Sequence, residues 1–200
     1  LTVVVASLES GWPLMRSCFI KSLSRTKVTS CPVSLIAPKT VTEPGMTPRY
    51  SSIFSGRTGT AGAVGPLPVR GKNGENRQLL DIASIFVLEN MLRERGVDPQ
   101  PLWYSADEWV DFGEPLELWI QATAAALAQA IVAAASIIDF GAAVIDGGFP
   151  AWVRKRIVTA TLEAVARLDL RGVVIPDIIE GKVGSQARAI GGASLPIRSE

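Results

Sequence analysis

A long stretch without any charged side chain constrains the fold most strongly. It runs from Leu118 to Ile138, is mainly alanine and other apolar residues, and follows Pro115, which suits the first turn of a helix. A helix of this length can cross a bilayer. However, it contains several polar side chains and its flanks, Glu117 and Asp139, are acidic rather than basic. The sequence therefore predicts a helix over 115–138 that is buried in a large α/β domain, with no membrane as partner.

The composition describes a folded and nearly neutral chain. Its 200 residues are 48% hydrophobic, and 20 Lys and Arg face 19 Asp and Glu, so charge gives no direct signal for nucleic acid. The chain has no His, which removes the commonest general base and metal ligand. Two cysteines, Cys18 and Cys31, and an N-terminus without a basic n-region and apolar h-region predict a cytoplasmic protein.

Residues 1–50 differ from the rest of the chain. They are rich in Ser, Thr and Pro, and their basic side chains outnumber the two acids, Glu9 and Glu43. The pieces between the prolines are too short for helices, so we expect an irregular segment with a short valine-rich strand or two. The cations are sparse and not interleaved with aromatics, which disfavours a nucleic-acid-binding tail. We therefore divide the chain into an irregular or foreign segment, 1–50, and a folded lobe, 51–200.

From residue 77 onward the pattern becomes regular. The apolar spacing predicts helices over 77–96, 115–138, 151–168 and 185–195, strands over 142–145 and 172–176, a loop around Trp103 and Tyr104, and a capped helix start at Ser105–Glu108. Helices that alternate with strands are typical of an α/β fold, for which we expect a largely parallel sheet.

The turn after strand 142–145 is the best local signal for a site. Gly147 and Gly148 follow Asp146 directly and precede a helix, an arrangement that lets a ligand approach the backbone near a helix N-terminus. A tight turn that needs positive φ explains the same glycines. Asp146 either accepts a ribose hydroxyl or caps the next helix, and the sequence leaves both alternatives open.

Other catalytic patterns are missing from the sequence. Neither a Walker phosphate loop nor a Rossmann fingerprint is present, and the glycines of 59–65 have the wrong composition for either. The acidic side chains of 107–117 fit a solvated face better than a catalytic pair.

Four segments together resemble the C-terminal half of the ROK family (repressors, open reading frames and sugar kinases). They are Gly56–Gly65, Phe86–Glu89, Ile138–Gly148 and Gly184–Leu195, in the family's order and spacing over about residues 52–197. The resemblance implies an α/β fold of the actin-like ATPase (ribonuclease H-like) type, of which this chain holds the C-terminal lobe. It also implies a sugar or sugar derivative as ligand, with Gly62 and Glu89 as substrate-binding residues, and ATP as cofactor beside Gly147 and Gly148.

The departures from the family pattern concern its chemistry. The sugar loop of the family carries Gly-Glu-x-Gly-His, whereas this chain has Gly62-Ala63-Val64-Gly65-Pro66. The cysteines and glycines of the next family motif are replaced as well, and of that motif only Glu89 remains. We therefore expect no zinc. Nothing before the lobe resembles the family's Asp base, its phosphate loops or its helix-turn-helix.

Three hypotheses follow. The first is a ROK-type sugar-binding or regulatory protein, a transcriptional regulator or kinase relative, without catalytic residues. The second is an ATP-dependent hexose kinase that phosphorylates a sugar hydroxyl. The third is a truncated or frame-disrupted product in which 1–50 is foreign. A lobe without its partner exposes apolar surface, so we also expect a homodimer or poor solubility.

Overall fold

The computed structural model describes residues 2–6, 35–36, 53–54, 57, 64–104 and 109–184, and for the first three ranges only the backbone. Its strands are β1 (Thr2–Ala6), β2 (Leu35–Ile36), β3 (Ile53–Phe54), β4 (Pro68–Arg70), β5 (Asn76–Gln78), β6 (Ala142–Asp146) and β7 (Asp177–Glu180). Its helices are α1 (Leu79–Ala83), α2 (Ile85–Glu94), α3 (Pro101–Tyr104), α4 (Glu114–Ile138) and α5 (Ala151–Val165). Helices and strands are thus mixed, as the α/β prediction requires.

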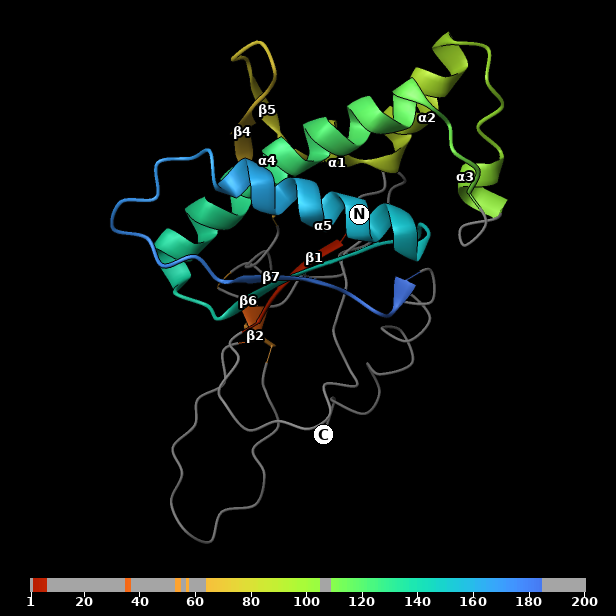
Figure 1. The fold of residues 1–200 in the computed structure, drawn as a ribbon. Coiled ribbons are helices and arrows are strands. Elements are labelled where there is room, and N and C mark those ends of the chain that lie inside the picture. Colours follow the sequence, from red (N-terminus) through yellow and green to blue (C-terminus); the bar gives the residue numbers. More distant parts are fainter. Residues whose placement is uncertain are drawn as a thin grey trace, which may run out of the picture.

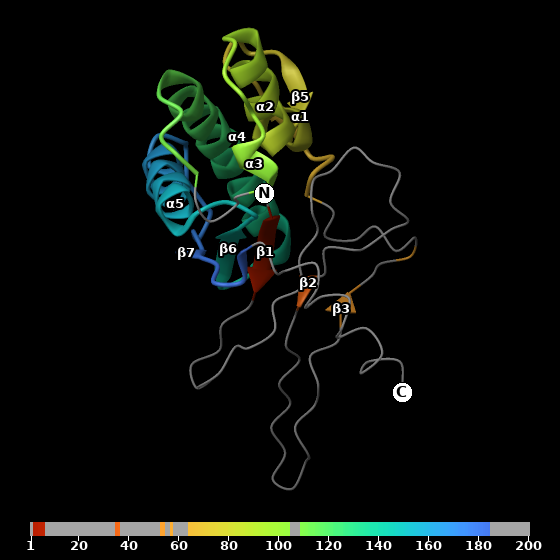
Figure 2. The same ribbon diagram turned by 90° about the vertical axis from the view of Figure 1, so that its right-hand side faces the viewer.

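The main sheet has five strands in the order β3-β2-β1-β6-β7, which Figure 2 shows from one side. The pairs β6–β7 and β1–β2 are parallel, whereas β1–β6 and β2–β3 are antiparallel. The prediction of a largely parallel sheet is therefore wrong. Its error lies in residues 1–54, where strands of two and five residues are too short to give a periodic signal. The division of the chain near residue 50 stays a prediction, although β1 pairs directly with β6.

Strand β6, helix α5 and strand β7 form a βαβ unit. Every residue of β6 is buried, and its pairing with β7 runs from Ala142 opposite Asp177 to Ile145 opposite Glu180. Helix α5 connects the two parallel strands and packs against both. The predictions of a buried strand over 142–145 and a helix over 151–168 are confirmed, with the helix ending at Val165.

Helix α4 is the central helix of the described structure. Figure 1 shows it beside α5, with both helices over the same face of the sheet, and α4 also packs against α1, α2 and β4. Its length and composition alone would allow it to cross a membrane, but half of its most apolar window is buried inside the protein. The prediction of a buried helix over 115–138 is confirmed.

The helix predicted over 77–96 is broken in the structure. Asn76–Gln78 belong to β5, and Ser84 has an extended backbone (φ −70°, ψ 141°) between α1 and α2. The Ser84 side chain accepts a hydrogen bond from Phe86 N and so caps α2. Its carbonyl oxygen accepts a hydrogen bond from the indole of Trp119 on α4, at 3.0 Å. The break thus depends on a contact with a distant helix, which periodicity cannot reveal.

The strand predicted over 172–176 is also misplaced. Gly172 has φ +80°, Val174 is 82% exposed, and the strand begins only at Asp177. Pro176 has no N–H to donate to a sheet, which is consistent with pairing that starts after it. The loop predicted around Trp103 contains the short helix α3. Residues Ser105–Glu108 and the helix predicted over 185–195 lie outside the described residues, and 109–113 are not helical.

Candidate functional site

The candidate site is the edge of the sheet at which the parallel strands β6 and β7 end. In open α/β sheets, ligands bind at the carboxyl ends of the strands. Here two glycine-containing segments meet, the turn Gly147–Gly148 after β6 and the loop 181–184 after β7. Hydrogen bonds hold the two segments together: the backbone N–H groups of Val183 and Gly184 donate to the carboxylate of Asp146, which directly precedes the turn.

Asp146 is the polar centre of this edge. Its side chain is only 3% exposed, and Oδ1 accepts hydrogen bonds from Gly147 N at 2.8 Å and from Arg154 Nη1 at 3.0 Å. Oδ2 accepts from Val183 N at 2.9 Å, and Gly184 N donates to both oxygens. A carboxylate has about four acceptor positions. The carboxylate is therefore fully engaged, and it neither caps α5, whose N-cap is Pro150, nor has an oxygen left for a ribose hydroxyl.

The predicted role of Gly147 and Gly148 as ligand contacts stays a prediction. Neither Gly147 nor Gly148 has positive φ, so the alternative of a strained tight turn does not apply to them. A Cβ atom at Gly147 would overlap the ring of Phe149. The chain needs glycine at 147 because its own aromatic side chain fills that space, which is an internal reason for the residue.

An aromatic cluster connects this turn with helix α2. Phe149 packs against Trp109 and Trp119, with ring centroids 6.1 Å and 6.2 Å apart. Both Phe149 and Trp119 are 1% exposed, and the Trp119 indole donates to Ser84 at the start of α2. Packing therefore couples the glycine turn to the helix that carries Glu89.

Glu89 lies on α2, away from the glycine turn, and no described contact joins the two. Its side chain is 10% exposed and forms an ion pair with Arg93, one helical turn further along, whose side chain is 55% exposed. Among the described residues Arg93 is its charged partner. A buried carboxylate with one solvent-facing partner retains acceptor capacity for donors such as sugar hydroxyls.

Of the loop that opens at Gly56, the structure describes Arg57 and the residues from Val64 onward. Gly62 and Ala63 lie outside the described residues, so the predicted role of Gly62 stays a prediction. Gly65 is buried and its carbonyl accepts from Leu80 N at 2.9 Å, whereas Pro66 is exposed. The end of this loop thus packs on α1, at the root of the hairpin β4–β5.

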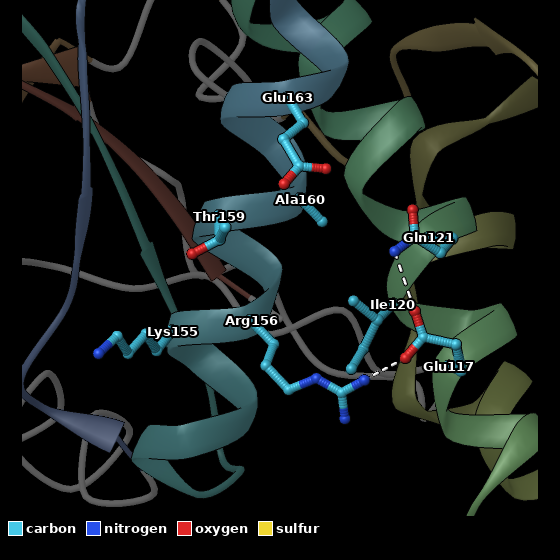
Figure 3. Close-up of a pocket in the computed structure, with 8 residues that line it drawn as sticks. All are labelled: Glu117, Ile120, Gln121, Lys155, Arg156, Thr159, Ala160 and Glu163. Atoms are coloured by element: carbon cyan, nitrogen blue, oxygen red, sulfur yellow. Dashed lines mark hydrogen bonds and ion pairs between the residues drawn. The ribbon is translucent and has the colours of Figure 1, made fainter.

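A shallow groove between α4 and α5 has no counterpart in the predictions. Its cavity measures about 270 Å³ and is lined by Glu117, Ile120, Gln121, Lys155, Arg156, Thr159, Ala160 and Glu163. Figure 3 shows Arg156 and Gln121 both reaching Glu117, while Lys155 points away from α4. Arg156 and Glu117 are each more than 40% exposed, and exposed ion pairs stabilise little. Nothing in this mixed lining selects a ligand.

Titration and metal binding add little to the site. A side-chain hydrogen bond from Arg171 and, to a smaller extent, one from its backbone N–H lower the pKa of Asp169. The side-chain hydrogen bond to Asp169 raises the pKa of Arg171. This exposed pair lies in the turn between α5 and β7. Among the described residues no group of three or more His, Cys, Asp or Glu could hold a metal ion. The absence of zinc stays a prediction.

Comparisons with known proteins support the fold rather than an activity. No protein-family model matches the sequence, and no curated protein matches it significantly. A solved structure of a ROK family protein from Streptococcus pneumoniae TIGR4, in complex with sucrose, matches 70% of this chain at 18% identity, with a TM-score of 0.50. The ROK hexokinase from Thermus thermophilus matches 74% of the chain at 18% identity, with a TM-score of 0.48.

The match to the Streptococcus pneumoniae structure confirms the predicted resemblance to ROK proteins at the level of the fold. The chain spans about half the length of the structures it matches, 49% of the first and 52% of the second.

Proposed function

We propose that the chain is a cytoplasmic sugar-binding protein related to the ROK family, a transcriptional regulator or a kinase relative, that does not itself catalyse phosphoryl transfer. It would represent the C-terminal lobe of an actin-like ATPase fold. Support comes from the similarity of the fold to that of a ROK protein in complex with sucrose. In this proposal Gly62 and Glu89 contact the sugar, and Gly147 and Gly148 lie beside a nucleotide where one binds.

The state of Glu89 carries the proposal. Its side chain is 90% removed from solvent, yet its charged partner among the described residues is the half-exposed Arg93. Burial of a carboxylate is costly unless hydrogen bonds satisfy its oxygens. A sugar presents several hydroxyl donors, which would add hydrogen bonds to the one contact with Arg93. The proposal therefore makes Glu89 a ligand contact rather than a purely structural acid.

The engagement of Asp146 supports the non-catalytic part. A general base must have a lone pair within reach of the proton that it removes. Among the described residues Asp146 is the aspartate that is buried, and its oxygens accept hydrogen bonds from backbone N–H groups and from Arg154. An acid in this state holds the backbone in place and is poorly suited to proton transfer.

Calorimetric titration with glucose, fructose, mannose and sucrose tests the proposal, together with a coupled assay for ATP turnover. We expect weak binding of at least one sugar and no sugar-dependent turnover. Glu89→Gln should weaken that binding about 10- to 100-fold, because a hydrogen bond to a charged group contributes about 1.5–3 kcal/mol. Glu94→Gln is the matched control, since Glu94 lies exposed on the same helix, and should leave the affinity unchanged.

Two results would contradict the proposal. Failure of every sugar to bind removes the sugar-binding function. Sugar-dependent ATP hydrolysis would instead support the alternative of an ATP-dependent hexose kinase.

A homodimer is also part of the proposal, because Ile137 and Val174 expose 85% and 82% of their surface. Light scattering after gel filtration would measure the oligomeric state.

A further inference from the structure

We infer that Asp146 is a positioning residue: it fixes the loop after β7 against the glycine turn after β6, and ligand binding at this edge of the sheet depends on it. The link to a ligand rests on the proposed function, in which Gly147 and Gly148 face a nucleotide. The connection between the two loops rests on described contacts alone.

The loop after β7 has no sheet partner of its own at this point. The last backbone hydrogen bond between the ends of β6 and β7 joins Gly181 N, just after β7, to Ile145 O of β6, at 2.8 Å. Beyond it, the N–H groups of Val183 and Gly184 donate to the Asp146 carboxylate at 2.9–3.2 Å. A single side chain thus continues the connection between β6 and β7 where the ladder ends.

The backbone around the carboxylate is shaped to receive it. A Cβ atom at Gly181 would overlap the side chain of Asp146, so only glycine leaves room there. Gly184 has φ +59°, a left-handed conformation that favours glycine and that accompanies the approach of its N–H to both carboxylate oxygens. Two glycines of the loop are therefore explained by Asp146 rather than by chain flexibility.

Arg154 extends the arrangement to helix α5. Its Nη1 donates to Asp146 Oδ1 at 3.0 Å and lies 3.5 Å from the carbonyl oxygen of Phe149, and its side chain is 11% exposed. Hydrogen bonds between ionised groups are about twice as strong as neutral ones. The carboxylate consequently joins the turn, the loop after β7 and the first turns of α5 into one unit. A binding surface made of backbone atoms requires such a fixed arrangement.

The test compares Asp146→Asn with the unmodified chain. An asparagine can keep the hydrogen bonds to Oδ1, but its amide nitrogen cannot accept the N–H of Val183. Hydrogen exchange should therefore become at least tenfold faster at the Val183 and Gly184 amides and stay unchanged in α4. Calorimetry with ATP and Mg²⁺ as the probe should show at least tenfold weaker binding.

Val165→Ala is the matched control, because Val165 is buried at the last turn of α5, eleven residues beyond Arg154, and has no polar side-chain atom. At a similar loss of thermal stability it should change neither the loop exchange nor the affinity. Where Asp146→Asn does not fold, Arg154→Gln removes one partner and keeps the three backbone donors, and a smaller change in the same direction is expected.

Unchanged exchange at Val183 and Gly184 overturns the inference. Faster exchange with unchanged affinity for ATP and Mg²⁺ overturns the dependence of binding on Asp146. Failure of the unmodified chain to bind this probe contradicts the proposed nucleotide contact at Gly147 and Gly148, whereas the exchange rates still decide whether Asp146 holds the loop.

Discussion

The glycine turn after β6 and helix α2 each hold a buried acid, and the two acids are held very differently. Asp146 accepts hydrogen bonds from three backbone N–H groups and from Arg154, three of them from residues at least eight positions away. Glu89 has as its charged partner Arg93, four residues along the same helix. The first acid is fixed by tertiary contacts, and the second by a local pair that faces solvent.

This difference indicates which acid can serve a ligand. An acid whose oxygens are occupied by the backbone can shape a site, but it cannot accept bonds from a substrate without giving up its own. An acid with one exposed partner can accept hydroxyl donors at little cost. Burial alone therefore does not identify a binding residue; the partners of the buried group must be counted.

Removal of Trp119 should have the largest effect, because this side chain joins the two regions. It packs on Phe149 of the turn and donates to Ser84 at the start of α2. Trp119→Ala should lower the free energy of unfolding by about 3–5 kcal/mol, as for other large-to-small core changes, measured by urea denaturation. Trp103→Ala, at a 51% exposed site, should change it by less than about 0.5 kcal/mol. A loss below about 1 kcal/mol for Trp119→Ala would show that the two regions are not coupled.

A methyl group at Gly147 tests the packing of the turn. Gly147→Ala should cost about 1–3 kcal/mol, because the new Cβ atom overlaps the ring of Phe149. The second change Phe149→Leu makes room for it, so the double variant should be more stable than the sum of the single losses predicts. Strictly additive losses in this double-mutant cycle would contradict the steric explanation.

The smallest effect is expected at the local pair of α2. Arg93→Ala should lower the free energy of unfolding by about 0.5–1 kcal/mol, somewhat more than a fully exposed pair one helical turn apart because Glu89 is buried, and less at high salt. Arg167→Ala is the control, since Arg167 pairs with Glu163 at the same spacing on α5. A loss above about 2 kcal/mol would place Glu89 in the same class as Asp146 and remove the contrast between the two acids.

Much of the fold could be predicted where the signal is continuous along the chain. Helix α4 follows from a charge-free apolar stretch, strand β6 from a short apolar run and helix α5 from amphipathic spacing, each carried by one local segment. The sequence also placed the turn at Gly147 next to an acid. It could not assign a role to Asp146, because two of the donors lie 37 and 38 residues further along the chain.

The sequence by itself determined the apolar helix α4, the buried strand β6 with helix α5 after it, and the resemblance to ROK proteins, which the fold bears out. Only the tertiary structure decided the break at Ser84, the start of β7 after Pro176, the mixed direction of the strands and the partners of Asp146. The physical reason is the same in each case. A helix or buried strand is encoded by neighbouring side chains, whereas a hydrogen bond or a sheet pairing between distant residues is encoded by neither partner alone.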